Sequence, residues 1–344
     1  MKKFYSLALA IFLASTYSAQ MQVTPSISDE TLEDWIEGTD VIVSNLIVEC
    51  DSAAYGTFLN PYTDSNLEVV EGVLFATGLA SNAVLGGQLG YLENPYSGDP
   101  DLEMSLPGFE MNDVCRIEFD VVPLFEYMLF DYVFGSEEYP EWVGSSFNDI
   151  FGFFVSGPGI TGTFTNGAAN YSNVPGTDLP VAINNVNIGL NAEYYIDNEF
   201  SSDSSACAYD GLTTNLPGII ECQPSGTYHV KIVIADVLDS AFDSGVFLQK
   251  ESFMSVPSIV GIEELSSLNL DIFPNPTSEY LNLNGDDLQV ISSYKMLNIE
   301  GKVVQFGSLS GDRRIDVQEL SNGTYTMILM NDARVAGAIN WVKK

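Results

Sequence analysis

Four carboxylates crowd one short segment of the sequence, FGSEEYPEWVGSSFNDIFGFF at residues 134–154. Glu137, Glu138, Glu141 and Asp149 lie between two apolar runs, and the segment contains no Lys, Arg or His. Two like charges about 4 Å apart repel by about 1 kcal/mol in water and by about 4 kcal/mol near a protein surface. Such a cluster needs a proton, a basic side chain or a metal ion as its partner.

A hard cation is the partner that the sequence favours, because basic residues are nearly absent nearby and several protonated acids are not expected in an exposed loop at neutral pH. A second acidic loop, ADVLDSAFDSG, follows an apolar run at residues 230–235. Calcium accepts about six to eight carboxylate, carbonyl and amide oxygens in flexible geometry. We therefore predict a calcium site where the two loops meet, with the candidate ligands Glu137, Glu138, Glu141, Asn148, Asp149, Asp236, Asp239 and Asp243.

The competing interpretation is that these acids cap turns, accept backbone N–H bonds or face water. Neither loop has the spacing of an EF-hand. Aromatic residues in the first loop have two interpretations as well. Tyr139 and Trp142 could stack on a sugar beside the ion, whereas such rings elsewhere belong to the core.

Catalysis has few candidate residues. The single histidine, His229, lies in the alternating run TYHVKIVIA, which favours a structural role. A glycosidase needs only two carboxylates, and Glu137 or Glu138 with Asp149 or Asp236 would be that pair. Many acids packed together favour an ion over an acid and a base with separated pKa values. We predict a non-enzymatic protein for adhesion or glycan binding, with a polysaccharide-acting hydrolase or a structural matrix protein as the alternatives.

Charge is distributed unevenly along the 344 residues, whose formal net charge is −35. Residues 21–256 contain 36 acidic residues and only three basic ones, Arg116, Lys231 and Lys250, whereas residues 257–344 contain 11 acidic and seven basic residues. The acidic surface excludes nucleic acid and anionic lipid as partners. The two regions are therefore expected to serve different roles.

The N-terminus MKKFYSLALAIFLASTYSAQ has a basic start, an apolar stretch and a small residue at Ala19, which predicts a signal peptide over residues 1–19. No later segment is long and apolar enough for a transmembrane helix. Export places Cys50, Cys115, Cys207 and Cys222 in an oxidising environment. Three pairings are possible, and the short loop between Cys207 and Cys222 favours that pair, leaving Cys50 with Cys115. A zinc site is disfavoured because no C-x-x-C spacing occurs.

Short β-like runs separated by turn residues continue from residue 41 to about residue 253, and several, such as IFGFFV, are apolar on both faces. Only residues 28–39 are typical of a helix, with Ser28 as its N-cap. We predict an all-β fold: a large two-sheet, jelly-roll-like β-sandwich over residues 20–256, a linker over 257–267, and a small Ig-like β-sandwich of about seven strands over 268–344.

The second unit resembles the type A C-terminal sorting domain of the type IX secretion system of Bacteroidetes. The resemblance depends on LDIFPNPTSEYLNLNG, YKMLNIEGKVV, DVQELSNGTYTMILMND and the basic end NWVKK, and most of all on Pro274-Asn275-Pro276, Gly301-Lys302 and the segment 320–325. It implies an interaction with the secretion machinery and passage across the outer membrane. The sorting domain is then usually removed, and the remainder is attached to surface lipopolysaccharide or released.

The first unit resembles the choice-of-anchor L domain of secreted bacterial proteins. The segments that carry the resemblance are GVLFATG, IEFDVVP, YVFGSEEYPEWVGSSFNDIFGFFVSGPG, VAINNVN, EYYIDN, YDGLTT and TYHVKIVIADVLDSAFDSGVFLQKESF. This family implies an extracellular or surface location, but its name describes tethering and supplies no activity. The function must therefore be argued from the residues.

Overall fold

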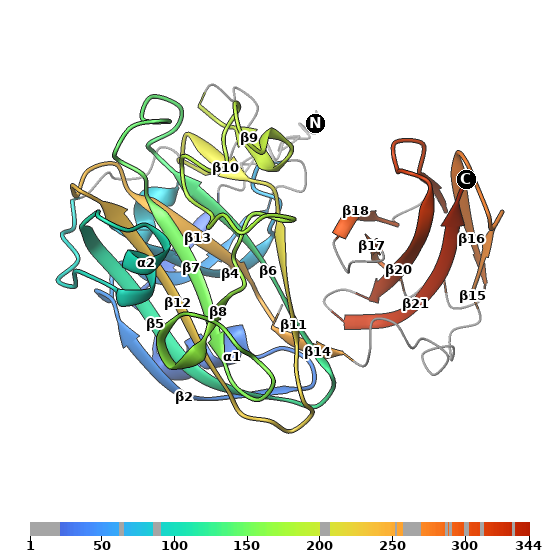
Figure 1. The fold of residues 1–344 in the computed structure, drawn as a ribbon, viewed down its shortest axis with the longest axis horizontal. Helices are drawn as coiled ribbons and strands as arrows, with labels where there is room; N and C mark the ends of the chain where they lie inside the picture. Colours follow the sequence, from blue (N-terminus) through green and yellow to red (C-terminus); the bar gives the residue numbers. More distant parts are fainter. Residues whose placement is uncertain are drawn as a thin grey trace, which may run out of the picture.

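Two stacked antiparallel sheets form the large unit (Figure 1). The computed structural model describes residues 21–61, 65–84, 91–199, 207–251, 253–256, 270–285, 288, 291–298, 303–309, 313–331 and 334–344. The predicted signal peptide and linker lie outside these residues. The all-β sandwich expected from the alternating runs is confirmed.

The larger sheet has β6 near its centre, with two strands along each side of it. It consists of β1 (Gln22–Pro25), β3 (Tyr55–Leu59), β4 (Glu71–Ala76), β13 (Ser244–Gln249), β6 (Tyr127–Ser136), β10 (Gly211–Thr213) and β9 (Tyr195–Asp197) in that order, with β11 (Leu216–Glu221) and β14 (Met254–Val256) also paired to β6. The smaller sheet has the order β2 (Val41–Glu49), β5 (Met111–Pro123), β12 (Tyr228–Val237), β7 (Ile150–Ser156) and β8 (Ala169–Asn170).

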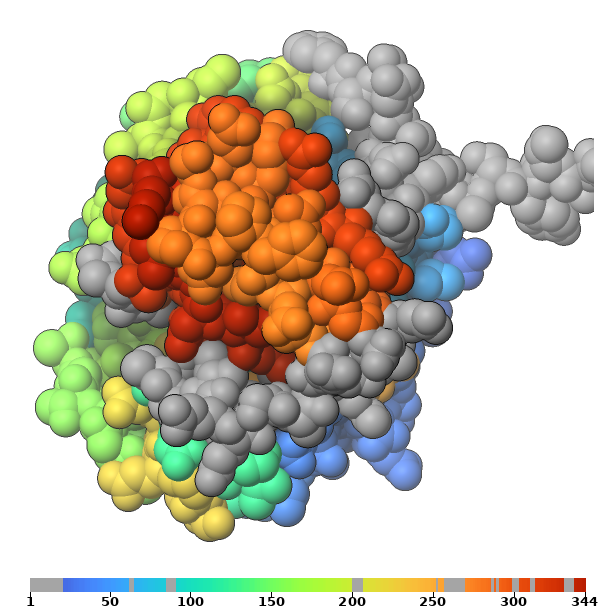
Figure 2. All heavy atoms as spheres, turned by 90° about the vertical axis from the view of Figure 1, so that its right-hand side faces the viewer, coloured from blue at the N-terminus to red at the C-terminus, as the bar shows by residue number. Residues whose placement is uncertain are grey.

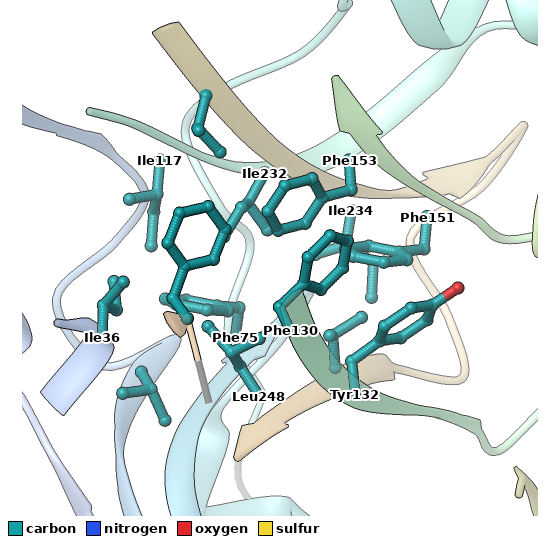
Figure 3. Close-up of a cluster of buried hydrophobic side chains, with 14 of the residues drawn as sticks. Ile36, Phe75, Ile117, Phe130, Tyr132, Phe151, Phe153, Ile232, Ile234 and Leu248 are labelled. Atoms are coloured by element: carbon teal, nitrogen blue, oxygen red, sulfur yellow. The ribbon is translucent and has the colours of Figure 1, made fainter. Parts of the chain in front are cut away.

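Aromatic and aliphatic side chains from both sheets fill the space between them (Figure 3). Phe130 of β6 stacks on Phe153 of β7 with ring centroids 3.8 Å apart, which joins the two sheets directly. The outward side chains are covered too, because Phe154 and Ile150 of β7 belong to a separate cluster with Leu102. This burial on both faces explains why IFGFFV lacks polar alternation.

The predicted helix is present as α1 (Asp29–Ile36). The Ser28 side chain accepts a hydrogen bond from the Thr31 N–H, and Leu32 and Ile36 are fully buried. A second helix, α2 (Pro100–Ser105), was not expected from the sequence; Asp99 caps it by accepting from the backbone N–H groups of residues 101 and 102. The 3-10 turns are η1 (Ala80–Ala83), η2 (Thr165–Gly167) and η3 (Ala192–Tyr194).

The C-terminal unit contains seven described strands in two sheets, as its turn spacing predicts. One sheet has the order β15 (Leu270–Phe273), β16 (Tyr280–Gly285) and β19 (Arg314–Asp316), and the other β18 (Val303–Ser308), β17 (Ser293–Leu297), β20 (Gly323–Asn331) and β21 (Arg334–Lys343). Its core includes the stacked rings of Tyr325 and Trp341.

The C-terminal unit packs against the large unit, and Figure 2 views the molecule from the side on which it lies. Met254 and Val256 of β14 share an apolar cluster with Leu297, Ile328 and Met330 of the C-terminal unit. An ion pair between Lys295 and Asp131 also joins the two units. The two units therefore meet through a small apolar interface supported by one salt bridge.

One of the two predicted disulfides is present. Cys50 and Cys115 are bonded, with their Cα atoms 4.4 Å apart. The predicted Cys207–Cys222 bond is wrong: the structure has these residues as two separate, buried thiols. β10 and β11 run along β6 from one end to the other, so the segment between these cysteines is extended and not looped. Residues 211–221 follow β6 from one end to the other at about 3.3 Å per residue in the strands, so Cys207 and Cys222 lie near opposite ends of β6.

Candidate functional site

The two acidic loops meet because four strand ends meet. Ser136, at the end of β6, pairs with Ser244, at the start of β13. Ile150, at the start of β7, pairs with Ala235, near the end of β12. The connection from β12 to β13 crosses from one sheet to the other at this end of the sandwich, so the loop after β6 and the loop after β12 are brought together.

Three carboxylates form the inner part of this site: Glu138, Asp149 and Asp236, each about 1% exposed. Asp149 is held by two hydrogen bonds, from the backbone N–H of Val237 at 3.1 Å and from the Ser244 hydroxyl at 2.6 Å. Within the described residues, no hydrogen bond of ordinary geometry reaches either oxygen of Asp236 or Oε2 of Glu138, although the Thr77 hydroxyl and the Asp149 carboxyl lie close enough to Asp236 to act on its pKa. Buried carboxylate oxygens without partners are costly, so this site has unused capacity for a donor or a cation.

Burial dominates the electrostatics of these three residues. Burial, together with the charge of Asp149, raises the pKa of Glu138 to about 8. Burial also raises the pKa of Asp149, although the hydrogen bonds from Ser244 and Val237 oppose it. Asp236 has a pKa raised well above its usual range by burial and by the neighbouring charge of Asp149. The site therefore attracts positive charge, whether as protons or as a metal ion.

Glu137 and Asp243 form a second acidic pair beside the inner three. The Asp243 backbone N–H donates to Glu137 Oε2 at 3.2 Å, and the Asn82 amide donates to Asp243 Oδ2 at 3.1 Å. Burial and the charge of Asp243 raise the pKa of Glu137 to about 7. Gly78 leaves room for this pair, because a Cβ there would lie 2.1 Å from Asp243 Oδ2. We call Glu137, Glu138, Asp149, Asp236 and Asp243 the acidic cluster.

The other three predicted ligands are placed differently. Glu141 is exposed, and its charge acts on Asp210 and Glu199 at the rim. Asn148 is buried, but its Oδ1 accepts from the Asn184 backbone N–H at 2.8 Å, so it supports the loop. Asp239 is exposed at the edge of the cluster, where its charge contributes to the raised pKa of Glu138.

The donor chemistry of the cluster fits a hard cation, because it offers carboxylate oxygens and a nearby hydroxyl and no nitrogen or sulfur. The spacing is less complete: in the described part of the chain, no three Asp, Glu, His or Cys side chains are already arranged around one point as metal ligands. Glu138, Asp149 and Asp236 are the residues that would hold an ion. The oxygens of Asp236 and Oε2 of Glu138, which no well-formed hydrogen bond reaches, are the observation that supports this assignment.

Small polar residues beside the cluster were not identified from the sequence. Thr77, Ser136 and Ser244 are fully buried. The Ser136 hydroxyl accepts from the Glu138 N–H at 2.9 Å, and the Thr77 hydroxyl accepts from the Ser244 N–H at 2.9 Å. Each of them lies at the end of an apolar strand run, in ATG, GSEE or DSG, and that position was the available signal.

The two aromatic candidates for ligand binding differ in exposure. Trp142 is 36% exposed, and its ring lies 5.1 Å from Phe147 and 6.2 Å from Phe242, which is 50% exposed. Tyr139 is fully buried, and its hydroxyl donates to the Val186 carbonyl at 2.6 Å, so the prediction that it contacts a ligand is wrong. Trp142 and Phe242 therefore form an exposed aromatic group beside the acidic cluster.

His229 has a structural environment on β12, far from this cluster in the register of the sheet. Its Nδ1 lies 3.0 Å from Asp120 and its Nε2 lies 2.9 Å from Glu118, both on the neighbouring β5. Burial acts to lower its pKa, but hydrogen bonds that the two carboxylates accept from the ring, together with their charges, raise it. Both ring nitrogens are therefore already engaged.

Comparison with known families gives two matches along the chain. Residues 19–254 match the choice-of-anchor L domain, and residues 271–338 match the secretion system C-terminal sorting domain. No curated protein is significantly similar to the chain.

Among solved structures, the chain is similar to one titled "Biofilm associated protein - BSP domain", with 8% identity and a TM-score of 0.19 over 69% of this chain and 49% of that chain. It is also similar to a beta-1,2-glucanase from Parabacteroides distasonis, with 8% identity and a TM-score of 0.19 over 68% of this chain and 32% of that chain. The chain thus spans about half of the first and a third of the second. Both likenesses are too weak to support an argument about fold or activity.

Proposed function

The chain belongs to the choice-of-anchor L family, and from this premise we propose that its large unit is a calcium-stabilised, non-enzymatic binding module for adhesion or glycan recognition. The C-terminal sorting domain indicates a secreted or cell-surface protein exported through the type IX secretion system, and it implies an interaction with that machinery. Within the described parts of the chain, no helix has the length and apolarity needed to cross a bilayer.

The oxygens of Asp236, which no well-formed hydrogen bond reaches, are the observation that carries the calcium proposal. This carboxylate is 1% exposed, is affected by the charges of Asp149 and Asp243, and has no basic residue among the described side chains to offset its charge. A buried charge of this kind is tolerated when it is protonated or coordinates a metal. Calcium suits the site because its ligand number and geometry are flexible enough for side chains from three separate segments.

The same end of the sandwich supports a binding role. Trp142 and Phe242 expose aromatic surface on the two loops that carry the cluster. An ion that joins these loops would also fix the two rings relative to each other, which favours stacking on a sugar or a protein surface. Hydrolysis is less well supported, because Glu138, Asp149 and Asp236 are buried together, whereas a glycosidase separates an acid and a base across an open cleft.

Calcium titration of the mature protein tests the ion. At a concentration one hundred times the dissociation constant, binding to the folded state alone adds about 2.7 kcal/mol, which raises the melting temperature of a unit of this size by about 5–10 °C. Asp236→Asn should abolish this increase, and the exposed control Asp178→Asn should retain it. A wild-type melting temperature that does not respond to calcium would remove the ion from the proposal.

A glycan array with residues 20–344, which retain the C-terminal unit, tests the binding role in calcium and in chelator. We expect binding that Trp142→Ala removes and that Phe306→Ala, which changes an aromatic residue 45% exposed in the C-terminal unit, leaves intact. Release of reducing ends from any bound polysaccharide would instead identify a hydrolase. Retention of all binding by Trp142→Ala would exclude the aromatic group as the contact surface.

A further inference from the structure

Apolar side chains are exposed on both loops that carry the acidic cluster. Leu238 and Phe242, on the loop after β12, are 39% and 50% exposed, and Trp142, on the loop after β6, is 36% exposed. Large apolar side chains that are gathered on one part of a protein surface mark a contact surface more often than those that are scattered singly. We call Trp142, Leu238 and Phe242 the apolar loop surface.

The backbone of the second loop is strained where it exposes these side chains. Leu238 has a φ of 78° and Phe242 a φ of 67°, in the left-handed region that bulky residues rarely adopt. Neither residue gains full burial in return. Strain of this kind is found where a function requires the conformation. The loop therefore favours display of these two side chains over stability.

Hydrogen bonds and packing hold the two exposed rings in place. The Glu137 N–H donates to the Asp243 carbonyl at 3.1 Å, and the Asp243 N–H donates to Glu137 Oε2 at 3.2 Å, which fixes the neighbouring Phe242 beside the end of β6. The Trp142 ring packs edge-on against Phe147, with centroids 5.1 Å apart. The rings are thus preorganised, and a partner would lose little entropy in ordering them.

Unpaired carboxylates lie next to the apolar loop surface. Glu141 precedes Trp142 and Asp239 follows Leu238, and both acids are exposed. The charge of Glu141 also acts on Asp210, so further acidic groups lie near it. Among the side chains that the structure describes, Glu141, Asp239 and Asp210 form no ion pair.

No basic residue of the large unit is free to neutralise these acids. Positions 21–256 contain three basic residues. Arg116 and Lys231 pair with Asp99, and Lys250 lies over the Trp35 ring. A negative potential therefore extends over this end of the sandwich, and it attracts a positively charged partner.

A protein segment with both basic and apolar side chains complements these features. Its Lys or Arg side chains would face the carboxylates and lie over the aromatic rings, and its apolar side chains would cover the exposed apolar ones. A neutral glycan would use the rings but leave the charges without a partner. Nucleic acid and anionic lipid would be repelled.

We propose that this end of the large unit binds a protein segment that combines basic with apolar side chains. Trp142 and Phe242 are its apolar contacts, and Glu141 and Asp239 pair with its cations. The inference rests on the proposed function and narrows it from adhesion or glycan recognition to adhesion to a basic protein segment. Calcium in the acidic cluster would fix the two loops without touching the partner.

Fluorescence polarisation with labelled repeat peptides tests the partner class on residues 20–344 in calcium. The probes are repeats of Lys-Phe-Gly, the charge-reversed Glu-Phe-Gly and Lys-Ser-Gly, which lacks the ring. Lys-Phe-Gly should bind at least about tenfold more tightly than either comparison, and added salt should weaken its binding. Equal binding of a comparison peptide, or no binding of Lys-Phe-Gly, would overturn the proposal.

Other occupants have distinct outcomes. Glycan-array binding that Trp142→Ala removes, without binding of Lys-Phe-Gly, would leave the proposed function intact and show that the choice of partner is wrong. Self-association that Trp142→Ala removes, seen by sedimentation, would identify a second copy of the chain as the occupant and would also overturn the inference.

Aromatic variants locate the peptide. Trp142→Ala and Phe242→Asn should each weaken binding of Lys-Phe-Gly about tenfold, and Phe306→Ala in the C-terminal unit should leave it unchanged. Asn accepts the left-handed backbone at position 242, so Phe242→Asn should melt no lower than the wild type and its loss of affinity is not a loss of folding. Unchanged affinity in both variants would show that the peptide binds elsewhere and would overturn the proposal.

Charge variants test the carboxylates. Glu141→Gln and Asp239→Asn should each weaken binding about two- to fivefold, and the matched exposed control Asp178→Asn should leave it unchanged. Equal weakening by all three substitutions would mean that the peptide responds only to the net charge of the protein, and the assignment to this surface would fail.

Discussion

Two buried aspartates in the large unit, Asp101 and Asp236, have the same exposure and opposite electrostatics. Each is about 1% exposed. Burial acts to raise the pKa of Asp101, but hydrogen bonds from Lys231 and from Thr165 outweigh it and the pKa is lowered. Burial and the charge of Asp149 raise the pKa of Asp236, and a hydrogen bond with the Thr77 hydroxyl lowers it by less than they raise it.

The difference shows that the presence of a basic side chain nearby, and not burial alone, decides whether the pKa of a buried carboxyl is lowered or raised in this protein. Arg116 and Lys231 both pair with the buried Asp99. Lys250 lies over the Trp35 ring near Glu71 and Glu251. All three basic residues of positions 21–256 therefore lie away from the acidic cluster. Asp99 and Asp101 are therefore paired with basic side chains of the same chain. The acidic cluster depends instead on protons or on an ion from outside.

Removing Lys231 should have the largest effect, because it would leave the buried acids Asp99 and Asp101 close together with less positive charge beside them. Lys231→Met leaves Asp99 and Asp101 without their shared partner, and breaking a buried ion pair in this way costs about 3–5 kcal/mol. Chemical denaturation should show a decrease near the upper end of that range. Lys250→Met removes two surface contacts of 3.8 and 3.9 Å and the contact with the Trp35 ring, and it should cost about 1 kcal/mol. Equal losses in the two variants would contradict the comparison.

The Cys50–Cys115 disulfide restrains the ion-paired side of the sandwich, since Glu49 and Arg116 are the adjacent residues. It closes a loop with a sequence separation of 65, for which chain entropy predicts about 4 kcal/mol of stabilisation. The double variant Cys50→Ala/Cys115→Ala should lose about this much in denaturant titrations while keeping the same calcium-induced increase in melting temperature. Loss of the calcium response would show that the two regions are coupled.

The sequence predicted the β-sandwich and the C-terminal unit because alternation and turn spacing are local signals. It also singled out the two acidic loops as ligands of one ion on the condition that they meet, because clustered acids without bases stand out in the sequence. It failed for Cys207 and Cys222, because fourteen intervening residues with turn-like composition form strands that run the length of β6. It missed the buried ion pairs of Asp99 with Arg116 and Lys231. These residues come from three segments that only the sheet register and α2 bring together.

Stability should depend on pH in opposite ways with and without calcium. Glu138, with a folded pKa of about 8, binds its proton more tightly when folded than when unfolded, so in chelator the free energy of unfolding should fall as pH rises from about 5 to 8. The decrease should be on the order of a few kcal/mol. Calcium binds the deprotonated carboxylates, so saturating calcium should reduce or reverse this slope.

His229 contributes a slope of the same sign in this range, because its pKa is also raised. Glu138→Gln should remove only the share of the slope due to Glu138 and leave the shares due to His229 and to the other buried acids of the cluster, Glu137, Asp149 and Asp236. Denaturant titrations at several pH values measure this share. An unchanged slope in Glu138→Gln would show that Glu138 is not a source of it.

The smallest expected effect is also the one that distinguishes the two regions by sign. Asp236→Asn keeps the size of the side chain but cannot ionise, so in chelator it should stabilise the protein by about 1–3 kcal/mol at alkaline pH, where the wild-type carboxyl has to give up its proton. The same substitution at Asp101 should destabilise it, because Lys231 and Thr165 would lose an ionised partner. Thermal unfolding of both variants in chelator makes the comparison directly. Destabilisation by both substitutions would mean that the Asp236 carboxylate already has a compensating partner, and the case for a cation from outside the chain would fail.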